Sequence, residues 1–268
     1  MSPEEVSAQG DRVAERLQQF QLTTAAPEMG PRLCQAGHEH ALAVIAEVLD
    51  LEAEARQQRR IARLRAAAQL PPGKTWATFD ATRLPVALQQ RLAEVRRGEF
   101  LDRAVNVLSF GLPGVGKSHA ACAVGHSLVE DGQSVLFRPA YQLVQELLAA
   151  KRDCTLPRLL HKLDGFALLV VDDIGYVKQN AEEAEVLFTL ISERYERRSL
   201  LVTSNLMFSE WERIFKDTMA TAAAIDRLVH HAIILEFTGA SYRTTAAGRE
   251  SPAPSSPRSR TRRPQGSS

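Results

Sequence analysis

The segment from residue 105 to residue 118 constrains the fold of this 268-residue chain more than any other. An apolar run at 105–110 leads into the sequence GLPGVGKS at 111–118, and a helix-favouring stretch follows from Lys117 to Glu130. The glycines leave room for a loop of inward-pointing backbone N–H groups, which suits the oxygens of a triphosphate. Strand, glycine loop and helix, in that order, form the context in which this spacing binds phosphate. The segment therefore predicts a nucleotide site at the end of a buried strand.

The predicted nucleotide-binding residues are the loop and the first turn of its helix. They are Gly111, Leu112, Pro113, Gly114, Val115, Gly116, Lys117, Ser118 and His119. Lys117 is expected to reach the β- and γ-phosphates and to act in catalysis, and the Ser118 hydroxyl is expected to ligate Mg²⁺. The positive end of the helix strengthens the field on the phosphates. ATP and Mg²⁺ are the predicted cofactors.

A second apolar run, LLVV at 168–171, ends in Asp172 and Asp173. A buried parallel strand brings such a carboxylate to the carboxyl edge of the sheet, beside the phosphate loop. Asp172 is predicted to hold Mg²⁺ through water, together with Ser118. Asp173 is predicted to polarise the attacking water, the alternative being a strand-end carboxylate without a catalytic role. Many proteins with this kind of phosphate loop carry Glu at this second position. The shorter Asp therefore predicts slow ATP hydrolysis or a base that acts through an extra water.

Three further residues are candidates for sensing or completing the site. Asn205, after a fourth strand, is predicted to orient the water near the γ-phosphate, although asparagine also favours strand-end turns. Arg227 follows Asp226 on a late helix, either as a surface pair or as an arginine finger donated to the ATP of a neighbouring subunit. Arg243 is a weaker candidate, as a nucleotide-sensing arginine or a strand-edge residue.

Strand and helix patterns alternate from residue 105 onward. Strands are expected at 105–110, 134–137, 166–171, 199–203 and 233–237, and helices at 117–130, 140–151, 181–197, 208–216 and 219–231. This alternation predicts an α/β fold of three layers around a mostly parallel, doubly wound sheet.

The chain divides into three predicted parts. Residues 1–70 form a small helical N-terminal module for self-association or partner contact, with a short helix at 11–20 and a long one from His40 until Pro71-Pro72-Gly73 stops it. Residues 71–247 form the ATPase core, of which 71–80 reads as a linker. Residues 248–268 are rich in proline, serine and arginine and are expected to be a disordered basic tail.

Composition narrows the functional classes. The formal net charge is +1, and the excess of positive charge lies in the tail at 248–268. Contact with nucleic acid must therefore come from local basic patches. Three widely spaced cysteines suggest neither a disulfide framework nor a cysteine zinc site. The acidic start and the absence of an apolar run near 20 residues predict a soluble, cytoplasmic protein without a membrane segment.

These motifs together resemble the IstB-like proteins, ATP-binding helpers of insertion-sequence transposition in the AAA+ class, which are close to the DnaC-type helicase loaders. The resemblance is carried by GLPGVGKSHAACAVGHSL, LLVVDDIGY, LLVTSN, AAIDRLVHHAIILEF and SYR, and by the helical leader before TWATFD. It covers roughly residues 10–245. It implies that the Asn205 strand lies between the strands of the phosphate loop and of Asp172, and that Arg227 is the family's interface arginine.

The resemblance also implies a function. An ATPase of this family assembles on duplex DNA, captures a target site and recruits or activates a separate transposase, with hydrolysis as a timing step. A helicase loader is the alternative within the same fold. A small-molecule P-loop kinase and a nucleotide-gated adaptor without useful turnover are alternatives of other classes.

Contacts with DNA are expected to depend on arginine and lysine and to be largely independent of sequence. Arg56, Arg59, Arg60 and Arg63 fall on one side of the long N-terminal helix. That face is either a surface for DNA or transposase or the solvated face of a self-associating helix. Other candidates near loops of the core are Lys151, Arg152, Arg158, Lys162 and Lys178.

Overall fold

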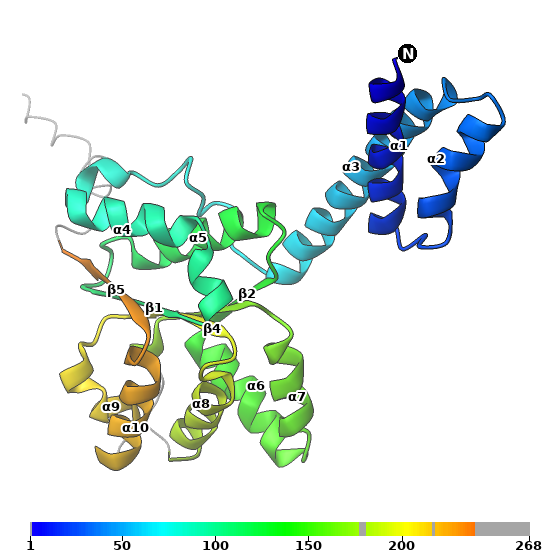
Figure 1. Cartoon of the computed structure of the whole chain (residues 1–268). Helices are drawn as coiled ribbons and strands as arrows, with labels where there is room; N and C mark the ends of the chain where they lie inside the picture. The colour runs from blue at the N-terminus through cyan, green and yellow to red at the C-terminus, as the bar shows by residue number, and fades with distance from the viewer. Residues whose placement is uncertain (1, 177–180, 216–217, 239–268) are drawn as a thin grey trace, which may run out of the picture.

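Five parallel strands form a sheet in the computed structural model, which describes residues 2–176, 181–215 and 218–238 (Figure 1). The strands are β1 (Asn106–Gly111), β2 (Val135–Pro139), β3 (Leu168–Asp172), β4 (Ser199–Ser204) and β5 (Ala232–Phe237). Their order is β2-β3-β4-β1-β5. β4 thus lies between the phosphate-loop strand and the Asp172 strand, as the resemblance implied, and the predicted α/β fold with a parallel sheet is confirmed.

Helices cover both faces of this sheet (Figure 1). One face carries α4 (Val86–Arg96) and α5 (Lys117–Glu130). The other carries α6 (Ala140–Arg152), α7 (Leu156–Asp164), α8 (Ala181–Arg194), α9 (Glu212–Phe215) and α10 (Thr218–Val229). Side chains of β3 alternate between the two hydrophobic cores, Leu168 and Val170 in one, Leu169 and Val171 in the other. The uninterrupted apolar run of β3 follows from this burial on both faces.

The N-terminal helices are more extensive than the sequence pattern indicated. They are α1 (Pro3–Gln19), α2 (Ala25–Gln35) and α3 (Ala41–Ala68). The predicted short helix at 11–20 is therefore part of a longer one, which Ser2 and Glu5 begin with a reciprocal capping box. A small separate core joins the three helices, made by Val13, Leu17, Ala26, Leu42 and Ala46.

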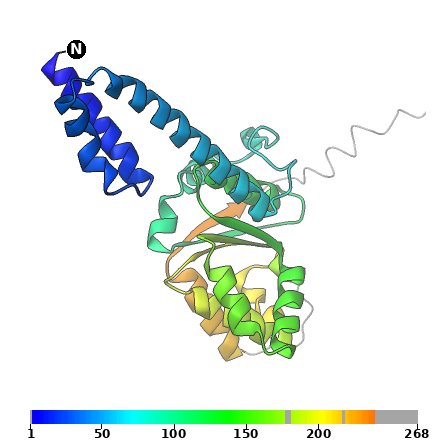
Figure 2. The ribbon, with the colours of Figure 1, turned by 90° about the vertical axis from the view of Figure 1, so that its right-hand side faces the viewer.

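The second half of α3 lies on the α/β core, while α1 and α2 project away from it (Figure 2). Arg60 donates from Nη2 to the carbonyl oxygen of Gly132 at 2.9 Å, and Arg65 forms an ion pair with Glu130 at 2.7 Å. Ala68, at the end of the helix, is fully buried in the core beside α5. The helix thus connects the two parts of the chain directly.

Several short elements were not predicted. They are the 3₁₀ turns η1 (Ala81–Arg83), η2 (Glu99–Arg103) and η3 (Ile174–Tyr176), and the helices α4 and α7. Within the predicted helix at 208–216 the structure has the 3₁₀ turn η4 (Phe208–Glu210) and the short helix α9. The predicted tail at 248–268 lies outside the described residues. The division of the chain at residue 70 remains a prediction.

A buried arginine stabilises the amino edge of the sheet, the edge at which the five parallel strands begin. The side chain of Arg194, at the end of α8, is 1% exposed and donates to the carbonyl oxygens of Leu163, Phe166 and Ser199 at 2.8 to 3.0 Å. Burial lowers the pKa of its guanidinium to about 10. These bonds join the end of α8 to the segment before β3 and to the start of β4.

Candidate nucleotide site

The glycine loop turns through backbone conformations that other residues rarely adopt. Gly111 has φ +148°, and a Cβ there would lie 2.3 Å from the carbonyl oxygen of Phe237 on β5. Gly116, at the start of α5, has φ +103°. The close approach of β5 and the left-handed turn explain why glycine occupies these two positions.

Lys117 is held over the loop. Its side chain is buried, and Nζ donates to the carbonyl oxygens of Gly111 at 2.6 Å and Leu112 at 2.9 Å. Leu112 contributes this carbonyl while its side chain is exposed, and Val115 packs in the core below. The ammonium group is therefore held at the end of β1, where the backbone turns into α5.

A cleft of about 270 Å³ opens beside the loop. Its lining includes Pro113, Gly114, Gly116, Lys117, Ser118, His119, Asp173 and Asn205. The structure thus brings together residues from the loop, from the end of β3 and from the end of β4. Residues 74 and 78–80 complete the lining from the N-terminal side.

Asp172 lies behind the cleft in a short hydrogen-bonded chain. Thr203 donates from Oγ1 to Oδ1 of Asp172 at 2.6 Å and accepts the backbone N–H of Asp173 at 2.9 Å. Asp172 is buried, and among the described residues Thr203 is its hydrogen-bond partner. The role of Thr203 was not predicted from the sequence, although its place two residues before Asn205 on the neighbouring strand was a usable signal.

Asp173 reaches the cleft through a left-handed backbone turn. Its φ is +60°, a conformation that is uncommon outside glycine but that aspartate and asparagine adopt more readily than other side chains do. This turn separates the two adjacent carboxylates, because Asp172 remains behind the cleft while Asp173 lines it. The paired acids thus have distinct environments.

Asn205 lines the same cleft and has a buried polar atom beside Gly175. Its side-chain oxygen Oδ1 is buried and has no hydrogen-bond partner among the described residues. A Cβ on Gly175 would lie 2.2 Å from that oxygen, so the glycine leaves the space that the carboxamide occupies. A buried acceptor without a partner is costly unless a ligand or water satisfies it.

The predicted linker at 71–80 is part of the site. His119 lies within 3.1 Å of both the Thr75 carbonyl oxygen and the Thr78 hydroxyl, and the rings of Phe79 and His119 are 5.2 Å apart. Trp76 donates from Nε1 to the Ser127 hydroxyl at 2.8 Å. Two aromatic residues in an otherwise polar stretch were the signal that this segment packs on α5.

Arg227 lies far from this cleft, at the opposite edge of the sheet. It lies in the last turn of α10. There the side-chain N–H of Asn106, at the start of β1, donates to the carbonyl oxygen of Leu228 at 3.1 Å. The guanidinium donates to the carbonyl oxygen of Ala223 and lies 5.0 Å from the ring centre of Phe188. The phosphate loop follows the other end of β1, so Arg227 does not line its own chain's cleft. Arg243 lies outside the described residues.

One buried thiol lies close to the site. Cys122 on α5 is fully buried, and desolvation raises the pKa of its thiol to about 12. The positive charge of Lys74 opposes this rise in the pKa, and the negative charge of Asp172 adds to it. The thiol is therefore neutral at physiological pH and contributes packing.

The glycine loop, the carboxylates after β3 and the strand order define a P-loop ATPase of the AAA+ class. Solved structures with this fold include a DnaC helicase loader and the AMPPCP-bound DnaA of Aquifex aeolicus. The first has a TM-score of 0.50 at 19% identity and covers 62% of this chain and 98% of its own. The second has a TM-score of 0.51 at 18% identity and covers 63% and 51%. These similarities concern the fold.

Sequence comparison defines the family. The model of the IstB-like ATP binding protein family matches residues 13–249. An insertion-sequence ATP-binding protein of Sinorhizobium fredii is 45% identical over 204 residues, which are 76% of this chain and 68% of that protein. The IS21 ATP-binding protein of Pseudomonas aeruginosa is 39% identical over 195 residues, 73% and 74% of the two chains. The chain belongs to the IstB-like family, as the sequence motifs predicted.

Nowhere in residues 2–176, 181–215 and 218–238 is a helix both long and apolar enough to cross a bilayer.

Proposed function

We propose that this ATPase regulates DNA transposition by assembling on duplex DNA and recruiting or activating a separate transposase. The observation that carries the proposal is the family match over residues 13–249, in a chain whose cleft is lined by Lys117, Ser118, Asp173 and Asn205. The relatives are named as ATP-binding proteins of insertion sequences, so a transposase encoded nearby is the expected partner. The DNA it acts on lies in the bacterial cytoplasm, which is the proposed location.

ATP hydrolysis is assigned to groups at the carboxyl edge of the sheet. Lys117 neutralises the β- and γ-phosphates while backbone amides of the loop hold their oxygens. Asp173, which lines the cleft, accepts a proton from the attacking water. The unpartnered oxygen of Asn205 accepts the other hydrogen of that water and fixes its direction. Because Asp is one methylene shorter than Glu, the proposal includes slow turnover.

The site also suits Mg²⁺. The ion prefers oxygen ligands and keeps several waters, and the hydroxyl of Ser118 and the carboxylate of Asp172 offer this donor set. Thr203 engages one oxygen of Asp172 and so orients the carboxylate, which would help to hold the ion. When bound, Mg²⁺ neutralises charge that develops on the phosphate oxygens.

Assembly is proposed to complete the site. Arg227 lies at the amino edge of the sheet and cannot serve the cleft of its own chain. In a head-to-tail arrangement the amino edge of one subunit faces the carboxyl edge of the next, which places Arg227 against the neighbour's γ-phosphate. Hydrolysis then requires an oligomer, and the nucleotide times its assembly and disassembly.

DNA contact is proposed on the arginine face of α3. Arg56 and Arg59 share Glu52 at 2.6 and 3.0 Å, and Arg60 is committed to the carbonyl oxygen of Gly132. The hollow between α1 and α3 is lined by these three residues together with Phe20 and Arg63. In the core, Arg152, Arg158 and Lys162 are further candidates, whereas Lys151 pairs with Glu185 at 2.6 Å. Lys178 lies outside the described residues.

The experiment is DNA-stimulated ATP hydrolysis over a protein titration, with Lys117→Ala as the inactive control. We expect turnover to rise with duplex DNA and to rise cooperatively with protein concentration. Arg63→Ala should weaken DNA binding and lower the salt slope by about one. Arg60→Ala is its matched control, because that side chain is engaged inside the chain.

Other outcomes would favour other functions. Turnover that is independent of DNA at every protein concentration contradicts the proposal, and phosphate transfer to a small acceptor would identify a kinase. Nucleotide binding without turnover on saturating DNA would identify an adaptor. Stable capture of a hexameric helicase, with no capture of the transposase encoded beside the gene, would identify a helicase loader.

A further inference from the structure

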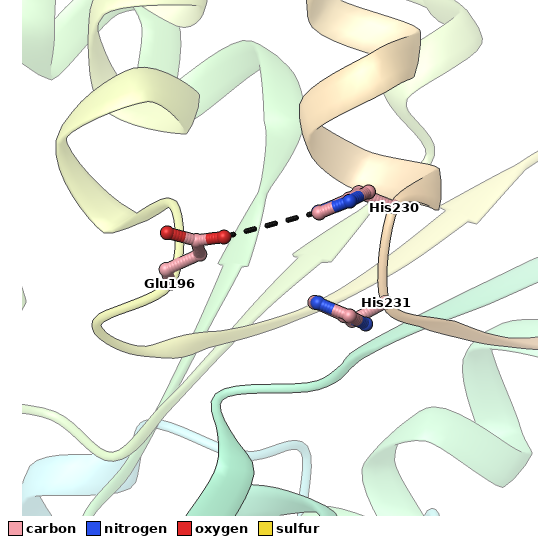
Figure 3. Close-up of side chains that lie close together, drawn as sticks. All are labelled: Glu196, His230 and His231. Carbon is pink, nitrogen blue, oxygen red and sulfur yellow. Dashed lines mark ion pairs between the residues drawn. The ribbon is translucent and has the colours of Figure 1, made fainter.

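A second group of chemically active side chains lies at the amino edge of the sheet. Glu196 follows α8, and His230 and His231 connect α10 to β5 (Figure 3). One potential ligand atom from each of the three residues lies within 4.8 Å of the others. All three side chains are exposed, so an ion in solution can reach them.

The backbone holds these three residues in place. Glu196 has φ +56° and follows directly on Arg194 and Tyr195, whose contacts tie the end of α8 to the sheet. The N–H of His230 donates to the carbonyl oxygen of Asp226 at 2.9 Å. The carbonyl oxygen of His231 accepts the N–H of Asn106 at 2.9 Å. Only side-chain rotations are needed to bring the ligand atoms together, which keeps the entropy cost of binding low.

The distances suit a small metal ion. His230 Nδ1 and Glu196 Oε1 are 3.8 Å apart. Two ligands of a tetrahedral Zn²⁺, each about 2.0 Å from the ion, lie roughly 3.3 Å apart. The same His230 nitrogen lies 2.9 Å from the hydroxyl of Tyr195, so a metal bound there replaces that hydrogen bond. A small rotation of these exposed side chains would shorten the 3.8 Å separation to the roughly 3.3 Å that a tetrahedral ion requires.

We propose that Glu196, His230 and His231 bind a divalent transition-metal ion, with Zn²⁺ as the reference case. Two imidazole nitrogens and one carboxylate oxygen are the donor set that such ions prefer, and water completes the tetrahedron. Mg²⁺ and Ca²⁺ prefer oxygen donors alone and are not expected to compete. His230 and His231 follow the last turn of α10, where the negative end of the helix dipole favours a cation.

The site borders the residue proposed to act between subunits. A cavity of about 190 Å³ is lined by Glu196 and His231 together with Arg103 and Arg227. The two arginines oppose a nearby cation, so the affinity is expected to be moderate. Where Arg227 acts on a neighbour's ATP, which rests on the proposed function, bound Zn²⁺ should slow hydrolysis by occupying the same interface.

The test is a calorimetric titration of the full chain, without an affinity tag, with Zn²⁺ in the absence of ATP and DNA. We expect one ion per chain at this site. Glu196→Gln and His231→Gln should each weaken binding by at least about tenfold, the lower end of what loss of supporting groups costs metal sites. His40→Gln is the matched control, since His38 and His40 form another neighbouring histidine pair with ring centres 6.0 Å apart.

Two further readouts make the result decisive. Zn²⁺ should raise the unfolding temperature of the unmodified chain and not that of either site variant, because a ligand that binds the native state stabilises it. Co²⁺ should give visible bands of low-symmetry coordination without a thiolate charge-transfer band. Affinity that is unchanged in both site variants, or a thiolate band from Cys34 or Cys154, overturns the proposal. Because no step measures ATP turnover, this failure is distinct from failure of the proposed function.

Discussion

The two edges of the sheet differ in how far the chain itself engages the charged groups of each candidate site. At the carboxyl edge, Lys117 and Asp172 are 4% and 8% exposed and each is held by hydrogen bonds from within the chain. At the amino edge, Glu196, His230 and His231 are exposed. The carboxyl edge is preorganised for a ligand, whereas the amino edge presents groups that a second molecule or ion can complete.

The parallel sheet accounts for this difference. All five strands point the same way, so loops and helix N-termini with free N–H groups gather at one edge, and helix C-termini gather at the other. An anionic nucleotide is favoured at the first edge and a cation at the second. Residues at the two edges therefore should respond differently to substitution and to protein concentration.

The largest effect that separates the edges is expected from Arg227→Ala. We expect ATP hydrolysis by the assembled protein to fall by roughly 1000-fold, the range measured for arginine fingers, with ATP affinity unchanged. The reason is that, in the proposed assembly, Arg227 contacts the transition state of a neighbour, while it does not line its own cleft. Steady-state turnover and nucleotide binding measure the two quantities separately.

Mixing variants tests whether that contact is made between subunits. Arg227→Ala keeps an intact cleft and Lys117→Ala keeps an intact finger, so a mixture should recover turnover that neither variant has alone. A mixture with no more activity than its components would mean that Arg227 acts within its own chain, and the distinction between the edges would fail.

Within the carboxyl edge, the two adjacent carboxylates should be separable. Asp173→Asn is expected to lower turnover by about 100-fold, the size of a general-base contribution, without loss of Mg²⁺-dependent ATP binding. Asp173→Glu should keep or raise turnover, because the longer side chain reaches the water directly. Equal losses in the two variants would show that the left-handed turn at Asp173, and not its carboxylate, limits the rate.

The sequence predicted the carboxyl edge well because its signals are local. The bounds of α5, Lys117–Glu130, agree with the predicted helix, and the strand order follows the resemblance. Loop spacing and the run that ends in Asp172 each depend on residues close together in the chain. Such patterns predict the structure reliably because they depend on glycine torsions and on strand burial.

Tertiary contacts explain what the sequence analysis missed. The segment 71–80 reads as a linker because of Pro71-Pro72-Gly73, yet Trp76 and Phe79 pack against α5, and Phe79 lines the cleft. α2 was not predicted because Pro27, Gly30 and Pro31 lie within it, and its helix packs in the small N-terminal core. The cluster of Glu196 with His230 and His231 joins residues more than thirty positions apart, and no spacing rule indicates it.

A smaller effect is expected from a substitution that adds one methyl group. Gly175→Ala would place its Cβ 2.2 Å from Oδ1 of Asn205, so the carboxamide must rotate away. We expect turnover to fall by about tenfold, as for a water held in a poorer orientation, while ATP affinity stays the same. Asn205→Ala should lower turnover at least as much, and Gly175→Ala should add nothing to it. Additive losses in the double variant would show that the glycine acts independently of Asn205.

The smallest effect should come from the segment that covers the cleft. Thr78→Val keeps the shape of the side chain and removes the hydroxyl that donates to the Gly73 carbonyl oxygen at 2.8 Å and contacts His119 at 3.1 Å. One neutral hydrogen bond is worth about 0.5–1.5 kcal/mol, so KM for ATP should rise by about threefold. Because the segment contacts ground state and transition state alike, kcat should not change. Thr155→Val on the far side of the sheet is the control and should leave both constants unchanged, since its hydroxyl bonds only to the Ala150 carbonyl oxygen among the described residues. A fall in kcat for Thr78→Val would mean that the segment acts in the chemical step. The catalytic part of the site would then include this segment as well as the phosphate loop and the two carboxylates.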